Sequence, residues 1–140
     1  MEGFYPGDFD QEKLQHKPIC GVLAVAIAAG VRYEVAFAAC KREMPGHAKR
    51  FRGGTYFEQR MRAVSGFGIL WTDLTESYPN WSVSQFASYM DRSKFTFMID
   101  IRGHCLTLKN GFIIDQSGCV PWQQYKHPRI RFHKLVRIEG

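Results

Sequence analysis

Apolar residues in the first half of the chain follow patterns typical of helices. Residues Cys20–Ala29 are apolar on every side, which predicts a helix buried at the centre of a domain. Gly30 follows directly and would end this helix in the left-handed conformation. Further helices are expected over Tyr33 to about Arg42, over about Thr55 to Val64, and from an N-cap at Ser82 to Met90.

The second half of the chain changes to the two-residue alternation of β-strands. Helices followed by an antiparallel sheet predict an α+β fold. No repeat or Pro/Ser-rich linker interrupts the sequence, so a single domain is expected over residues 1–140. The expected strands are Ile69–Thr72, Lys94–Ile101, His104–Lys109, Phe112–Asp115 and Ile130–Ile138.

Asn110 and Gly111 form a strong signal for a two-residue type I′ hairpin turn between two of these strands. Such a turn pairs Lys109 with Phe112, and continuing the pairing along the strands places His104 and Asp115 on one face as diagonal neighbours. The backbones of diagonal neighbours are about 7–8 Å apart, a span that an imidazole and a carboxylate can bridge.

Composition and charge narrow the possible classes of protein. The chain has 140 residues, of which 45% are hydrophobic and 14% aromatic, and this excludes a disordered tail or linker. The net charge of +6 favours anionic partners, nucleic acid among them. Residues 1–13 contain no apolar signal segment, and the longest apolar run, residues 19–29, is too short to span a bilayer. We therefore expect a soluble cytoplasmic protein that has no membrane partner.

The four cysteines lack the paired spacing of a zinc or iron–sulfur site, so neither a metal nor another cofactor is expected. Disulfides are not expected without a secretory signal. Cys40 and Cys105 are predicted to be structural, Cys105 because it faces away from His104 on an alternating strand. Cys119 is expected to pack in the core or in a loop. Cys20 is the candidate for chemistry.

Cys20 stands at the start of the expected buried helix, where backbone N–H groups and the helix dipole favour a thiolate. Gly21 would leave the backbone beside it open to a ligand. His104 could act as the base, and Asp115 could orient the imidazole and stabilise its charged form. Gln15 could donate a hydrogen bond to an oxyanion together with the N–H of Cys20. These are the parts of an acyl-transfer site.

Each of these residues also has a purely structural interpretation. Cys20 could be a buried core residue, and His104 could be a hydrogen-bonded histidine of the sheet. Asp115 could cap the turn that follows it, and Gln15 could be an exposed loop amide. A zinc site made of Cys20, His104 and Asp115 would lack a fourth ligand at motif spacing.

The order Gln15, Cys20-Gly21, Gly103-His104 and Asp115 resembles the papain-like cysteine peptidase superfamily. It is most similar to the small peptidase domains that process bacteriocin double-glycine leaders. The run over residues 19–35 also resembles short proteins common in phage and bacterial genomes. The resemblance extends over most of the chain.

This resemblance implies a papain-like fold with a central helix on an antiparallel sheet. Cys20 would be the nucleophile, His104 the general base, Asp115 the orienting acid and Gln15 the oxyanion donor. The substrate would be a peptide or protein, with hydrolysis, transfer to an amine or deamidation as the outcome. A phage-encoded enzyme of this kind would act in the host cytoplasm. The gap from Gln15 to Cys20 is one residue shorter than usual for the family, and the preceding residue, Ile19, is apolar.

A second hypothesis gives the chain no catalysis and makes it a binding protein for nucleic acid or a host protein. Arg129 and Arg131 alternate with apolar residues along the last expected strand, which would make one face of that strand basic. Lys134 extends this patch. A solvated face on an edge strand would show the same pattern. The two hypotheses differ in whether Cys20 is needed for function.

Overall fold

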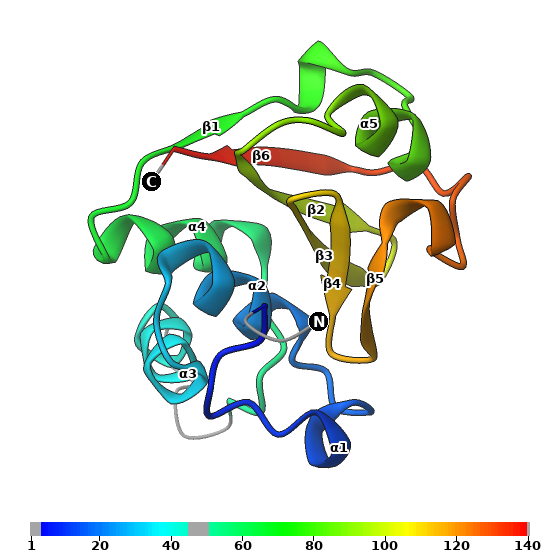
Figure 1. Ribbon diagram of the computed structural model, residues 1–140. Helices are drawn as coiled ribbons and strands as arrows, with labels where there is room; N and C mark the ends of the chain where they lie inside the picture. The colour runs from blue at the N-terminus through cyan, green and yellow to red at the C-terminus, as the bar shows by residue number, and fades with distance from the viewer. Residues whose placement is uncertain (1–3, 45–50, 140) are drawn as a thin grey trace.

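In the computed structural model, which describes residues 4–44 and 51–139, helices cover both faces of one antiparallel sheet (Figure 1). Helices α2 (Cys20–Ala29), α3 (Tyr33–Arg42) and α4 (Phe57–Gly66) pack on one face, and α5 (Val83–Tyr89) packs on the other. The six strands lie in the order β1–β6–β2–β3–β4–β5. The fold is therefore α+β, as predicted. The strands are β1 Trp71–Asp73, β2 Thr96–Ile101, β3 His104–Lys109, β4 Phe112–Asp115, β5 Gly118–Pro121 and β6 Lys134–Ile138, and the short helices are α1 Gln11–Leu14, η2 Thr75–Ser77 and η3 Trp122–Gln124.

The helices of the first half agree closely with the sequence pattern. α2 has the predicted bounds and is buried along most of its length, and Gly30 ends it in the left-handed conformation with φ of 67°. α3 also has the predicted bounds. α4 begins at Phe57, slightly later than expected, where the Gln59 side chain accepts a hydrogen bond from the N–H of Tyr56 at 3.1 Å. At the start of α5, the hydroxyl of Ser82 accepts from a backbone N–H as an N-cap.

The β3–β4 hairpin has the predicted turn and register. Asn110 and Gly111 both have positive φ, 51° and 80°, as a type I′ turn requires. Lys109 lies opposite Phe112, and the ladder continues from there as far as the pair Thr107 and Ile114. His104 and Asp115 therefore come from the far ends of the two strands, away from the turn.

Alternating side chains give the sheet a separate apolar core on each face. Met98 and Cys105 pack with α2, α3 and α4, whereas Phe97 and Leu106 pack with α5. Since His104 is two residues from Leu106, it belongs to the α5 face of β3. Its place at the first residue of the strand, at the end of the sheet, lets its ring reach toward α2.

β1 and β2 each begin two residues later than predicted, and two further strands differ more strongly from the prediction. β5 was not expected, because Gly118 and Pro121 have low strand propensity, and it forms an edge of the sheet where a proline is tolerated. β6 begins at Lys134 rather than Ile130. The carbonyl oxygens of Pro128 and Ile130 instead accept hydrogen bonds from the first N–H groups of α5. This segment therefore caps the N-terminus of that helix and is not a strand of the sheet. β6 also lies between β1 and β2, so the interpretation of it as an edge strand is wrong.

The N-terminal segment joins the helical layer to the sheet. The Asp8 carboxylate accepts from the N–H groups of Tyr33 and Glu34 at 2.7 and 3.0 Å and so caps α3. The Tyr5 hydroxyl donates to the carbonyl oxygen of Asp115 at 2.7 Å. This segment therefore holds the start of α3 and the end of β4 at the same time.

Among residues 4–44 and 51–139, no single helix combines the length and apolar character needed to cross a membrane. Only α2 and α3 taken together pass that test, and the two helices are bent by 111° at their junction.

Candidate active site

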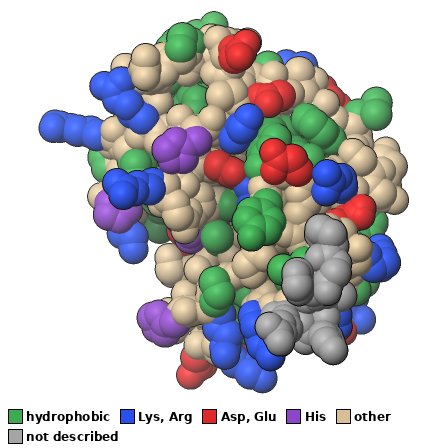
Figure 2. Space-filling model, turned by 180° about the vertical axis from the view of Figure 1, so that it is seen from behind, with side chains coloured by type: hydrophobic (Ala, Val, Ile, Leu, Met, Phe, Trp, Pro, Cys, Tyr) green, Lys and Arg blue, Asp and Glu red, His purple; other side chains and the backbone are tan. Residues whose placement is uncertain are grey.

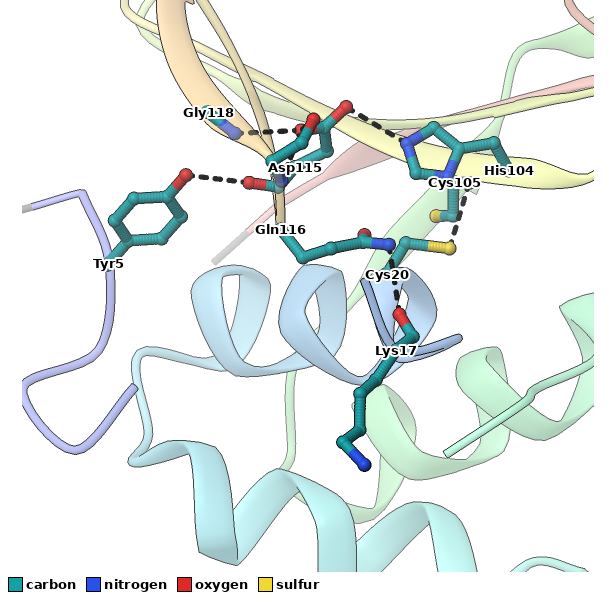
Figure 3. Close-up of polar contacts among 9 residues, drawn as sticks. Tyr5, Lys17, Cys20, His104, Cys105, Asp115, Gln116 and Gly118 are labelled. Atoms are coloured by element: carbon teal, nitrogen blue, oxygen red, sulfur yellow. Dashed lines mark hydrogen bonds and ion pairs between the residues drawn. The ribbon is translucent and has the colours of Figure 1, made fainter. Parts of the chain in front are cut away.

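Cys20, His104 and Asp115 come together where the first turn of α2 meets the open end of the β3–β4 hairpin (Figure 3). Cys20 is the first residue of α2, and its Sγ accepts a hydrogen bond from the N–H of Cys105 at 3.3 Å. Cys20 and His104 line a cavity of about 440 Å³ that is open to the surface. The thiol thus comes from the helical layer, and the imidazole and the carboxylate come from the sheet.

The imidazole of His104 links the other two side chains. Its Nε2 lies 2.9 Å from Oδ2 of Asp115. The ring lines the same cavity as the thiol of Cys20 and is close enough to lower the pKa of that thiol. Because Nε2 contacts the carboxylate, Nδ1 is the ring nitrogen that remains available to another group. His104 and Asp115, which were predicted to be diagonal neighbours across the hairpin, are therefore in direct contact.

The two oxygens of the Asp115 carboxylate make different contacts, one with the turn after β4 and one with His104. Oδ1 accepts from the N–H of Ser117 at 2.9 Å, from the Ser117 hydroxyl at 2.7 Å and from the N–H of Gly118 at 3.1 Å. Oδ2 faces His104. The two interpretations of Asp115 from the sequence, as a turn cap and as the partner of a histidine, thus both hold.

The pKa values of the three groups move in the directions that favour a charged pair. Burial raises the pKa of the Cys20 thiol, but the hydrogen bond and charge of His104, the N–H of Cys105 and the charge of Arg60 outweigh it and lower the pKa overall. Hydrogen bonds to Asp115 and to Cys20 raise the pKa of His104 from 6.5 to about 9. Burial raises the pKa of Asp115, yet the hydrogen bonds from His104 and Ser117 bring it below its usual value. Both shifts, the lowered pKa of the thiol and the raised pKa of the imidazole, favour a thiolate beside an imidazolium.

Arg60 is a charged residue of this site that the sequence pattern did not reveal. It is 4% exposed, lines the cavity and forms an ion pair with Asp100. Its Nη1 also donates to the Thr55 hydroxyl at 2.9 Å. From the sequence, Arg60 and Arg62 are the two basic residues of an amphipathic helix, and nothing distinguishes Arg60 from Arg62, which is exposed.

Gly21 lines the cavity beside Cys20, but the position that a Cβ would take is filled by other side chains. A Cβ at this position would lie 1.9 Å from Oγ1 of Thr55 and 2.9 Å from Cδ of Arg60. Glycine is therefore required here because the segment before α4 packs directly against the first turn of α2.

Gln15 is not among the residues that line the cavity. It follows the last residue of α1, and its Nε2 makes a 3.5 Å contact with the carbonyl oxygen of Glu12. A different amide, Gln116, lines the cavity and donates to the carbonyl oxygen of Lys17 at 3.0 Å (Figure 3). The sequence contains Gln116 directly after Asp115, but only the course of the turn brings it toward α2.

The other three cysteines have structural positions, and all four thiols are free. Cys40 and Cys105 are buried as predicted, and burial raises the pKa of Cys40 to about 12 and that of Cys105 well above its usual value. Cys119 is half-buried in β5. In the described part of the chain, no three or more His, Cys, Asp or Glu side chains are grouped to hold a metal ion.

The basic residues do not form the regular strand face that was predicted. Arg129 and Arg131 are exposed but precede β6, and Arg131 donates to the carbonyl oxygen of Asn80 at 2.9 Å. Lys134 is half-buried, with its ammonium 4.9 Å from the centre of the Phe57 ring. Figure 2 shows Lys and Arg side chains spread over one face of the molecule, with Asp and Glu among them.

Comparisons with models of protein families, with curated proteins and with solved structures found no match to this chain. The arguments about function therefore rest on the geometry described above.

Proposed function

We propose that this protein is a thiol-dependent hydrolase of the papain-like cysteine peptidase type, acting on a peptide or protein. One observation carries the proposal: the His104 ring contacts the Asp115 carboxylate at 2.9 Å and shares one open cavity with the Cys20 thiol. A histidine with only a structural role does not require both a partly exposed thiol at a helix start and a buried carboxylate as its neighbours.

The reaction starts from the thiolate of Cys20 and the imidazolium of His104. Cys20 attacks the substrate carbonyl carbon, and His104 gives its proton to the leaving amine, so that a thioester with Cys20 remains. A water molecule then gives a proton back to His104 as it attacks the thioester, and the acid and the thiolate are released. Asp115 keeps the ring oriented with Nδ1 toward the sulfur throughout.

The same residues support two related reactions, in which only the bond attacked or the acceptor differs. An amine in place of the water gives transfer, and attack on a glutamine side chain gives deamidation with release of ammonia. All three reactions use the same thioester, and they share the experiment below.

The layout of the elements also supports a papain-like fold. The nucleophile begins a buried helix, and the base and the orienting acid stand on neighbouring antiparallel strands packed against that helix. This is the arrangement that the resemblance of the sequence implies.

Alkylation by iodoacetamide between about pH 5 and 9, followed for each cysteine by mass spectrometry, tests the proposal. We expect Cys20 to react fast below neutral pH because its thiolate is stabilised, while Cys40 and Cys105 serve as buried internal controls in the same sample. His104→Ala should remove this fast reaction. Cys20 that reacts no faster at neutral pH than a free thiol of pKa about 8.5 would refute the charged pair and with it the hydrolase.

The alternative of a binding protein for nucleic acid or a host protein would gain support if Cys20→Ala left function intact. It would also require that changes at Arg129 and Arg131 abolish function in a salt-dependent manner. No observation on the described residues favours this alternative over the site around Cys20.

A further inference from the structure

Gln116 is a polar side chain of the cavity that the proposed mechanism does not use. It follows Asp115 in the turn between β4 and β5 and lines the same cavity as Cys20. Its bond to the Lys17 carbonyl ties this turn to the segment that leads into α2. The amide of Gln116 therefore reaches the end of the helix at which Cys20 lies (Figure 3).

The bond to Lys17 determines which end of the amide faces the helix start. A carbonyl oxygen can only accept, so the nitrogen end of the Gln116 amide faces Lys17. The other end, Oε1, is buried and has no hydrogen-bond partner among the described residues. The nitrogen carries two hydrogens and Lys17 takes one of them, which leaves the second N–H without an acceptor among the described residues, on a side chain that lines the cavity of Cys20.

An oxyanion is stabilised best by donors that are fixed before the reaction begins. The N–H of Cys20 is such a donor, because the first N–H groups of a helix have no acceptor within the helix. The turn of Gln116 is held from two sides. Asp115 Oδ1 accepts from the N–H groups of Ser117 and Gly118, and the Tyr5 hydroxyl holds the Asp115 carbonyl oxygen.

We propose that Gln116, rather than Gln15, is the side-chain oxyanion donor of this site. The inference rests on the proposed function. As the C–S bond forms between Cys20 and the substrate carbonyl carbon, the π electrons of the carbonyl move onto its oxygen. The second N–H of Gln116 and the N–H of Cys20 donate to this negative oxygen. Gln116 thus acts on the addition step and takes no part in forming the thiolate.

Two small reagents separate these steps without a known substrate. With p-nitrophenyl acetate, the Cys20 thiolate adds to the ester carbonyl, an oxyanion forms, and its collapse expels p-nitrophenolate and leaves acetyl-Cys20. With iodoacetamide, the thiolate displaces iodide from a saturated carbon and no oxyanion forms. The ratio of the two rates at Cys20, measured on the same sample by mass spectrometry, therefore reports oxyanion stabilisation and is insensitive to any unfolded fraction.

Gln116→Met keeps the length of the side chain and removes its donors, and Gln15→Met is the matched control. We expect Gln116→Met to lower the acetylation rate about 100-fold, the usual effect of losing one oxyanion donor, and to leave the alkylation rate unchanged. Gln15→Met should change neither rate. Gln116→Ala is the second variant if Gln116→Met does not fold.

Three results would overturn the inference while leaving the hydrolase standing: an unchanged ratio in both Gln116 variants, a fall of both rates together, or a lowered ratio in Gln15→Met. The second of these would mean that Gln116 positions the start of α2 instead of stabilising the oxyanion. A Cys20 that reacts with neither reagent in the unchanged protein would instead overturn the proposed function, and the inference with it.

Discussion

Oδ2 of Asp115 lies 2.9 Å from Nε2 of His104, and Oδ1 of the same carboxylate accepts hydrogen bonds from the turn that follows β4. A single carboxylate thus holds the His104 ring and closes the turn that carries Gln116. Because an ionised carboxylate only accepts hydrogen bonds, it can satisfy N–H groups on both sides, and a neutral amide cannot.

Asp115→Asn should therefore disturb the base or the turn, since the amide nitrogen must face one of them as a donor. We expect the pKa of His104 to fall from about 9 toward its ordinary value of 6.5, because the charged acceptor is lost. An NMR titration of the imidazole measures this change. Ser117→Ala removes a hydroxyl donor to Oδ1 and keeps the carboxylate, so it should leave the titration of His104 near that of the unchanged protein. An unaltered His104 pKa in Asp115→Asn would contradict the assigned contact.

The stability that His104 contributes should depend on pH in a defined direction. The folded state raises the pKa of His104 from 6.5 to about 9, so the folded protein binds this proton more tightly than the unfolded chain. The contribution is complete below pH 6.5, where both states are protonated, and it is lost as the pH rises from 6.5 to about 9.

The lowered pKa of the Cys20 thiol contributes with the opposite sign over the same range, so the contribution of His104 is measured by urea unfolding of Cys20→Ala with and without His104→Gln. The difference in the free energy of unfolding should shrink as the pH rises. The pKa of Asp115 is lowered, so its contribution has the opposite sign and is lost only as the pH falls below its usual range. A difference that grows between pH 6.5 and 9 would contradict the raised pKa of His104.

Gly21→Ala should destabilise the protein and slow the alkylation of Cys20. The new Cβ would meet Thr55 Oγ1 at 1.9 Å, so α2 and the segment before α4 must move apart. We expect a loss of about 1–3 kcal/mol in the free energy of unfolding, as for other overpacked positions. Gly66→Ala is the matched control in α4, because a Cβ there meets nothing within 4 Å. Equal effects of the two changes would show that the close approach to Gly21 is not important.

Arg60→Met should remove a buried charge and leave Asp100 without its partner. Breaking a buried ion pair in this way typically costs about 3–5 kcal/mol of stability. The alkylation midpoint of Cys20 should also move to higher pH, because the positive charge of Arg60 lowers the pKa of that thiol. Arg32→Met removes the partner of Asp8 in an ion pair whose arginine is 68% exposed, and it should cost less than about 1 kcal/mol.

The double variant Arg60→Met with Asp100→Asn separates the two effects of Arg60. It should recover part of the lost stability, because no unpaired charge remains buried. The shifted alkylation midpoint of Cys20 should persist. Recovery of the midpoint together with the stability would mean that Arg60 acts only through the packing of α4.

Local signals in the sequence were sufficient for the parts of the site that lie within one element. An apolar segment ending in glycine defined α2 and placed Cys20 at its start. The Asn110-Gly111 turn fixed the register of the hairpin, and the register brought His104 to Asp115. Each of these predictions depends on neighbours in sequence or on a two-residue turn.

The parts that the sequence did not predict depend on contacts between distant segments. Gln116 reaches the cavity because its turn is tied to Lys17, and Arg60 faces inward because it pairs with Asp100 on β2. The segment before β6 looks like a strand, but its carbonyl oxygens are used by the N-terminus of α5. The periodicity of a sequence does not predict such contacts, because they depend on how distant segments are placed in the folded chain.

The division of the site between two layers has a consequence for how the Cys20 thiol reacts. Cys20 belongs to the helical layer and His104 belongs to the sheet, and side-chain packing between the layers holds the two residues at one cavity. An expanded state that retains its helices and strands but loses fixed tertiary packing would separate the thiol from the imidazole. Cys20 would then react as an ordinary thiol, so the fast alkylation that we expect below neutral pH should disappear before the far-ultraviolet circular dichroism signal does.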